Sequence, residues 1–331
     1  MFELIKKLTE IPAVSGDERQ IAAAISEEIA PYTDLRLTDA LGNLICLRRG
    51  SGKGRRIMFS AHMDEVGFVA IFIEEDGFVR LSPVGRPLPA SAAYSEVVFG
   101  NGTRGVLVPD ADAPSGELKF EKAGVDIGAR SAEEAAKSVA VGDRCRLLPG
   151  LIKLGDGRVS GRPVSGRVGC AVLIAAAKEL ASRPERQRDD VFFVFTVQSE
   201  VGMRGAGPAA FTVRPDAAIT VDAAAAGDAH GAKGKKSGLG SGVGIKVRDG
   251  SVICDPGLVG ELASAAEAAS LPFEYRLTSD GSDDASAVQS SSVGVRTAAL
   301  SIPVRYIRTG AETADLGDVS ACAALVGAFL K

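Results

Sequence analysis

The segment Val191–Val197 (VFFVFTV) limits the fold more than any other part of this sequence, because it is apolar at almost every position. A strand that buries both faces belongs inside a parallel or mixed sheet that helices cover on both sides. Other apolar strand segments alternate with segments of helical periodicity, which is typical of an α/β fold. The expected strands are Leu44–Leu47, Ile57–Ser60, Ala217–Val221 and Thr297–Ile302, and the expected helices are 2–10, 17–31, 167–182, 256–270 and a last helix from about 316.

The stretch from residue 67 to 158 follows a different pattern. It contains short alternating β segments separated by Gly, Asp and Pro, with helical periodicity only near Ser131–Val139. This pattern predicts a small β-barrel inserted into the α/β domain. We therefore expect a discontinuous α/β domain made of residues 1–66 and 159–331, and a barrel domain at residues 67–158. Ser15 or Asp17 is a candidate N-cap for the second helix.

Charge and composition exclude several classes of protein. The 38 basic and 42 acidic residues are interspersed and give a net charge of −4, so we expect no nucleic-acid partner. No run reaches about 18 apolar residues, and Lys6 and Lys7 interrupt the start where an export signal needs an apolar stretch. We therefore expect a cytoplasmic protein without a membrane partner. The five cysteines form no C-x-x-C pair and there are only two histidines, so any metal site must be poor in imidazole.

Polar residues follow several of the expected strands, where α/β sheets place their chemistry. His62 follows one strand and Asp64 comes two residues later, so the imidazole can bind a metal ion while the carboxylate orients the ring. Glu200 follows the apolar strand Val191–Val197 in a loop that contains glycine, and Asp222 follows the next strand. Each residue alone is a weak signal, because a single histidine is more often a hydrogen-bonded structural residue.

Four ordered motifs resemble a known family, and they read SAHMDEVGF, TVQSEVGMRGAG, AITVDAA and LSIPVRYIRTGAET. In order and spacing they are similar to the co-catalytic zinc aminopeptidases that include the tetrahedral, deblocking and glutamyl aminopeptidases, sometimes labelled cellulase M. The resemblance implies a phosphorylase/hydrolase-like, mixed-sheet metallo-exopeptidase domain with an inserted β-barrel dimerisation domain. It also implies a homo-oligomer between a dimer and a dodecamer, zinc or cobalt as the metal, and removal of N-terminal residues from peptides.

The resemblance assigns roles to four residues that match the family's motifs. His62 matches a histidine ligand, and Glu200 and Asp222 match acidic ligands of the two-metal centre. Asp64 matches the carboxylate behind the histidine. These four residues favour a hydrolase.

Three other positions depart from the family's pattern. The bridging aspartate is replaced by Ser165, the general-base glutamate by Ser199, and the last histidine ligand by Arg308. A neutral serine cannot supply the anionic bridge between two dications, and serine needs a partner base to move protons near neutral pH. The guanidinium of Arg308 has no lone pair to donate and repels a cation.

These departures lead to a hypothesis about the site and leave two functional classes open. We expect Arg308 to occupy the place of the first metal ion and to pair with Glu200. One weak ion at His62 and Asp222 remains an alternative, with Asp283 or Asp228 as a third carboxylate. The chain is then either an aminopeptidase with lost or strongly reduced activity, or a non-catalytic structural, regulatory or peptide-binding subunit that assembles with itself or with active paralogues.

Overall fold

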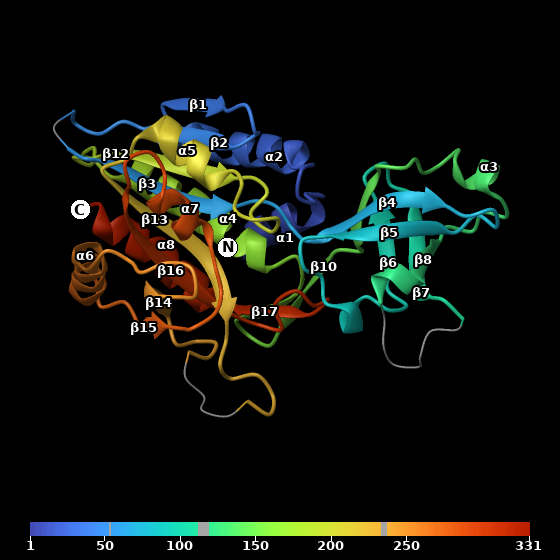
Figure 1. Cartoon of the computed structure of the whole chain (residues 1–331). Helices are drawn as coiled ribbons and strands as arrows, with labels where there is room; N and C mark the ends of the chain where they lie inside the picture. Colours follow the sequence, from blue (N-terminus) through green and yellow to red (C-terminus); the bar gives the residue numbers. More distant parts are fainter. Residues whose placement is uncertain (53, 112–118, 233–236) are drawn as a thin grey trace.

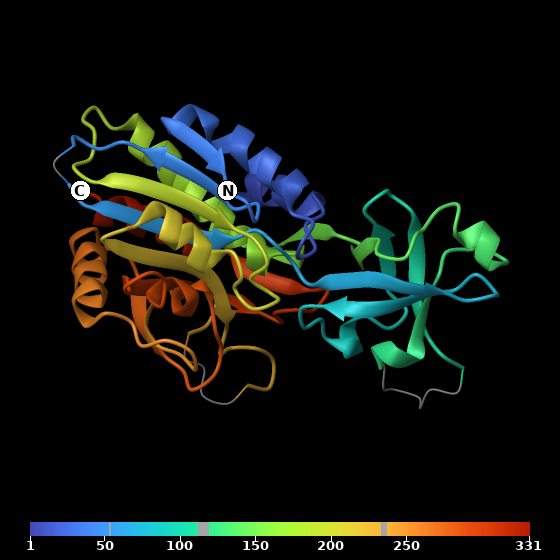
Figure 2. The ribbon, with the colours of Figure 1, turned by 45° about the horizontal axis from the view of Figure 1, so that its top comes forward.

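The computed structural model describes residues 1–52, 54–111, 119–232 and 237–331. These residues form an α/β domain around an 11-stranded mixed sheet and a closed antiparallel barrel of six strands. Figures 1 and 2 show the barrel to one side of the α/β domain, joined to it by the chain that leaves β3 and by the chain that returns to β10. The predicted fold class, an α/β domain with an inserted barrel, is confirmed.

Four neighbouring strands form the parallel centre of the large sheet. They are, in order, β12 (Asp190–Thr196), β3 (Arg56–His62), β13 (Ala217–Ala225) and β16 (Arg296–Arg305). Every residue of β12 after the first is buried, as its apolar sequence predicts. Because the strands run in the same direction, the residues at and after their carboxyl ends meet at one edge of the sheet.

The outer strands complete the sheet with mostly antiparallel pairings. On the β12 side lie β2 (Leu44–Arg48) and β1 (Leu35–Thr38). On the β16 side lie β17 (Glu312–Asp315), β11 (Arg158–Arg162) and β10 (Gly150–Leu154). Strand β14 (Val243–Arg248) also pairs with β16, and β15 (Phe273–Leu277) pairs with β14 in parallel.

Helices cover both faces of the sheet. The larger core lies under five helices: α1 (Phe2–Glu10), α2 (Arg19–Ile29), α4 (Ser165–Ser182), α6 (Pro256–Ala268) and α8 (Leu316–Phe329). The opposite face packs against α5 (Ala206–Val213) and α7 (Asp284–Gln289). No helix within the described ranges combines the length and the apolar character needed to cross a bilayer.

The barrel has a hydrophobic core of its own. Its strands in spatial order are β4 (Gly67–Ile73), β5 (Val79–Val84), β8 (Ala123–Asp126), β7 (Arg104–Pro109), β6 (Glu96–Phe99) and β9 (Arg144–Leu147). Phe68, Val97, Leu107 and Val125 are fully buried inside it. The closed barrel ends at Leu147, whereas β10 pairs with β11 and extends the large sheet.

The expected strands and long helices are present, with two differences worth explaining. Sequence reasoning missed the short elements β1, β14, β15, β17, α5 and α7, whose patterns are too brief to show a period. The expected N-cap at Ser15 or Asp17 is wrong, because α2 begins after Glu18 and no side chain caps it. The Ser15 hydroxyl instead donates to Asp64 in the candidate site.

Candidate active site

The candidate residues meet at the carboxyl edge of the parallel strands. His62 is the last residue of β3, Glu200 lies in the loop after β12, and Asp222 lies on β13. The amino end of α4 packs closely over this edge, because a Cβ atom on Gly166 would lie 2.7 Å from the Asp64 carbonyl oxygen and 3.0 Å from His62 Cε1. Only glycine permits this approach, which brings Ser165 to the same edge.

His62 lies between two carboxylates. Its Nδ1 is 3.2 Å from Asp64 Oδ1 and its Nε2 is 3.3 Å from Asp222 Oδ1. Burial by itself lowers the pKa of His62, but the carboxylates of Asp222 and Asp64 outweigh burial and raise the pKa well above its usual value. The two carboxylates therefore favour the protonated form of the imidazole.

Asp64 organises the loop that carries Glu200. Its carboxylate accepts hydrogen bonds from the Ser15 hydroxyl at 2.6 Å and from the backbone N–H groups of Ser199 and Glu200, both at 3.0 Å. Burial opposes ionisation of Asp64, yet the hydrogen bond and charge of His62 and the Ser15 and Glu200 donors lower its pKa overall. Asp64 therefore positions both the histidine ring and the loop.

Arg308 contacts Glu200, as the sequence hypothesis expects. Arg308 Nη2 lies 3.3 Å from Glu200 Oε2, and the two side chains are 39% and 13% exposed. Burial raises the pKa of Glu200, with the positive charges of His62 and Arg308 acting in the opposite direction. Arg308 has a left-handed backbone with φ of 67°, and its N–H donates to Glu312 Oε1 at 2.7 Å.

Ser165 is bound to a carboxylate that the sequence did not reveal. The Ser165 hydroxyl donates to Glu312, with distances of 3.0 and 3.1 Å to its two carboxylate oxygens. The same carboxylate accepts the backbone N–H groups of Val164 and Ser165 at 2.7 and 2.8 Å. Glu312 therefore accepts free N–H groups at the amino end of α4, where the helix dipole favours an anion.

Comparisons with known proteins identify the family. A profile of the M42 glutamyl aminopeptidases matches residues 42–325. This chain belongs to the M42 glutamyl aminopeptidase family. A protein of Acetivibrio thermocellus is 39% identical over 321 residues, which is 97% of this chain and 95% of the relative. These matches show that the chain is a metallo-aminopeptidase family protein, and the predicted resemblance is confirmed.

Solved structures of aminopeptidases have the same fold. An aminopeptidase from the archaeon Desulfurococcus kamchatkensis superposes with a TM-score of 0.94 at 34% identity, and the match covers 99% of this chain and 93% of that one. The TET1 peptidase of Pyrococcus horikoshii, which can assemble into a tetrahedron or a large octahedral shell, superposes with a TM-score of 0.88 at 33% identity. That match covers 99% of this chain and 98% of the other.

Ser199, in the loop after β12, contacts a buried acid. Its hydroxyl donates to Asp284 Oδ1 at 2.8 Å, and the Thr196 hydroxyl donates to the other oxygen of Asp284. Burial raises the pKa of Asp284 to about 6. The sequence analysis did not select Asp284, although an acidic residue followed by Ala-Ser-Ala at the start of a short helix was an available signal.

The carboxylates suggested as substitute ligands are engaged elsewhere. Asp283 pairs with the buried Lys246 and caps α7 through the N–H of Ala285. Asp228 pairs with Arg305, with a distance of 2.9 Å from Arg305 Nε to Asp228 Oδ1. Over the ranges that the structure describes, no group of three or more His, Cys, Asp or Glu side chains is arranged to hold a metal ion.

Proposed function

We propose that this chain is a cytoplasmic M42-family protein whose aminopeptidase activity is lost or strongly reduced, because ion pairs and hydrogen bonds replace its two-metal centre. The observation that carries the proposal is the 3.3 Å contact between the Arg308 guanidinium and Glu200. In the family resemblance both residues stand at ligand positions of one ion. A guanidinium there offers no lone pair to a metal ion, and its positive charge neutralises the carboxylate that would otherwise attract the ion.

The donor set does not fit two ions. The first set, matched to Ser165, Glu200 and Arg308, keeps one carboxylate, and that carboxylate contacts the arginine. The bridge between ions that typically lie about 3.5–4 Å apart would fall on Ser165, whose hydroxyl is committed to Glu312. The second set keeps His62 and Asp222, which supports at most one weakly held zinc or cobalt ion.

The general-base position is also altered. Ser199 cannot take up a proton near neutral pH, and its hydroxyl donates to Asp284 instead of facing a free acceptor. General acid–base catalysis is typically worth about 10²–10⁴-fold, so this change alone would strongly lower turnover. The site therefore lacks both a complete set of ligands for two metal ions and the general base on which two-metal peptide hydrolysis depends.

The barrel supports a role as a subunit of an assembly. We infer that the inserted domain predicted at residues 67–158, whose closed barrel runs from Gly67 to Leu147, acts as the dimerisation domain of a homo-oligomer. The structurally similar TET1 peptidase, which can assemble into a tetrahedron or a large octahedral shell, supports this inference. A chain without peptidase activity can act as a structural, regulatory or peptide-binding subunit, in an assembly with itself or with active paralogues. Light scattering tests this point, and a clean monomer at micromolar concentration would contradict it.

The first test is metal stoichiometry on protein purified without chelator, together with an aminoacyl-anilide assay in added Zn²⁺, Co²⁺ or Mn²⁺. We expect less than about one ion per chain and no measurable turnover. About two ions per chain with turnover would overturn the proposal.

A reversion variant provides the matched control. Ser165→Asp, Ser199→Glu and Arg308→His together restore the family's residues on the same backbone. We expect this triple variant to take up more Zn²⁺ than the parent chain in the same elemental analysis. If parent and variant bind equal amounts, the three substitutions are not what limits metal binding.

A further inference from the structure

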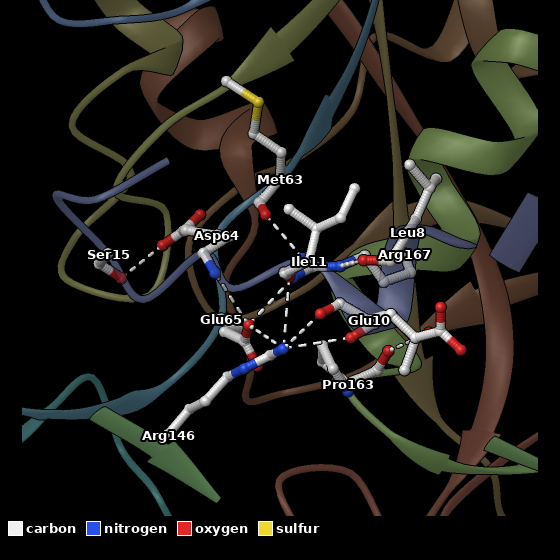
Figure 3. A network of polar contacts seen from close by, with 12 residues as sticks. Leu8, Glu10, Ile11, Ser15, Met63, Asp64, Glu65, Arg146, Pro163 and Arg167 are labelled. Atoms are coloured by element: carbon white, nitrogen blue, oxygen red, sulfur yellow. Dashed lines mark hydrogen bonds and ion pairs between the residues drawn. The ribbon is translucent and has the colours of Figure 1, made fainter. Parts of the chain in front are cut away.

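A second cluster of charges lies where the barrel meets the α/β domain (Figure 3). We call Glu65, Arg146 and Arg167 the junction cluster. Glu65 Oε1 accepts hydrogen bonds from Arg146 Nη1 at 3.0 Å and from Arg167 Nη2 at 3.1 Å, and none of the three side chains is more than 3% exposed. Glu65 lies between β3 and β4, Arg146 belongs to barrel strand β9, and Arg167 belongs to α4. The cluster therefore joins the two domains.

The carboxyl end of α1 completes the junction cluster. Arg167 Nε donates to the carbonyl oxygen of Leu8 at 3.0 Å, and Arg146 donates to the carbonyl oxygens of Thr9 at 3.1 Å and Glu10 at 2.7 Å. The last carbonyl groups of a helix have no partner within the helix and carry partial negative charge. They therefore balance the second arginine, which explains how two guanidinium groups share one buried carboxylate.

The junction cluster reaches the candidate site through the backbone of Asp64. On one side of Asp64, Arg167 Nη1 donates to the carbonyl oxygen of Met63 at 2.6 Å. On the other side, Glu65 is held by its ion pairs with the two arginines and by backbone hydrogen bonds to Ala13 and Ser15. The residues on both sides of Asp64 are thus fixed by the cluster. Asp64 in turn accepts the N–H groups of Ser199 and Glu200.

A second contact connects the barrel to the same loop. Gly85 follows β5 of the barrel and has a φ of 75°. A Cβ atom on Gly85 would lie 3.1 Å from Glu200 Cβ and 2.8 Å from Val66 Cγ1, so the barrel backbone packs directly against Glu200. Movement of the barrel would therefore change the surroundings of Glu200.

From these contacts we propose that Glu65 is a positioning residue, which fixes the barrel against the α/β domain and transmits the barrel's position through Asp64 to the Ser199–Glu200 loop. Arg146 is the barrel's own residue in this connection. A second chain that docks on the barrel and shifts it would alter the loop, even though it touches no residue of the site. The connection does not depend on whether the site hydrolyses peptides.

Amide hydrogen exchange of the full chain tests the connection in Arg146→Met. We expect the amides of Ser199 and Glu200 to exchange about tenfold faster than in the parent, because loss of a charge-assisted hydrogen bond loosens the Asp64 segment. The internal reference is α8, and exchange in the Ser199–Glu200 loop should accelerate by a larger factor than exchange in α8. Arg104→Met is the matched control, because Arg104 is an exposed arginine on barrel strand β7, and it leaves both regions unchanged.

Two results would overturn the proposal. Unchanged exchange at Ser199 and Glu200 in Arg146→Met would show that the loop does not sense the barrel. Equal acceleration of the loop and of α8 would show that the cluster only stabilises the whole fold. If Arg146→Met does not fold, Glu65→Gln takes its place, because the amide keeps the shape of Glu65 while it removes the charge; the same two results then decide.

Discussion

Two arginine–carboxylate contacts in this molecule differ in burial and in number of partners. In the junction cluster, the side chains of Glu65, Arg146 and Arg167 are 2%, 3% and 0% exposed, and the arginines also hold several backbone carbonyl groups. In the candidate site, Arg308 is 39% exposed and contacts Glu200 through one nitrogen at 3.3 Å. The first contact holds the two domains together, whereas the second lies in the candidate site.

The two contacts should contribute very different amounts to the free energy of unfolding. Removing one partner of a buried ion pair leaves an uncompensated charge and typically costs about 3–5 kcal/mol. An exposed ion pair is typically worth about 0.2–1 kcal/mol. We therefore expect the stability of the fold to depend more on the junction cluster than on the side chain of Arg308.

The largest effect is expected for Arg167→Met. The substitution leaves Glu65 and the Met63 and Leu8 carbonyl groups short of a donor in a fully buried place. The free energy of unfolding, measured by urea denaturation, should fall by about 3–5 kcal/mol. Glu28→Ala, which breaks the surface pair with Lys7, serves as the control and should change it by less than about 1 kcal/mol. Equal losses would break the comparison.

The next effect concerns Asp284, a buried acid of the site without a cation in hydrogen-bond contact. Its pKa is about 6 in the folded chain against a usual value of 3.8. The folded state therefore holds the proton more tightly, so this contribution favours folding below about pH 4 and is lost as the pH rises through about 6. The shift corresponds to about 3 kcal/mol.

Asp284→Asn should remove that contribution to the pH dependence. Stability curves between pH 4 and pH 7 should be flatter than those of the parent, whereas Asp280→Asn, an exposed residue of the same segment, should leave the slope unchanged. An Asp284→Asn curve as steep as the parent's would contradict the raised pKa.

A smaller effect is expected for Glu312→Gln. The carboxylate accepts the N–H groups of Val164, Ser165 and Arg308, and the neutral amide would weaken these charge-assisted bonds. The free energy of unfolding should fall by about 1.5–3 kcal/mol. Ser165→Ala, which removes only one neutral donor, should cost about 0.5–1.5 kcal/mol in the same measurement. The reverse order would show that the hydroxyl, and not the carboxylate, secures the end of α4.

The smallest effect is expected for Arg308→Met. Because Arg308 is partly exposed and contacts Glu200 through a single nitrogen, the free energy of unfolding from thermal and urea denaturation should change by less than about 1 kcal/mol. A loss comparable with that of Arg167→Met would remove the distinction between the two regions.

Much of this architecture could be predicted from local patterns. The apolar segment at β12 predicted a strand buried on both faces, and the shift to short alternating segments predicted the barrel, because burial and periodicity are local properties of a chain. Residues at strand ends, such as His62 and Glu200, could also be assigned to one edge. Local sequence patterns were therefore sufficient to predict the fold class and the approximate place of the candidate site.

The pairing of side chains, in contrast, depends on the packing of elements that are far apart in the sequence. Glu312 is 147 residues from Ser165, and Asp284 is 85 residues from Ser199. The junction cluster joins Glu65 to arginines 81 and 102 residues away. No local period records such contacts, because they depend on how separate elements pack and on which groups burial deprives of water. Ser15 shows the same limit: it looked like a helix cap in the sequence, and packing made it a donor to Asp64.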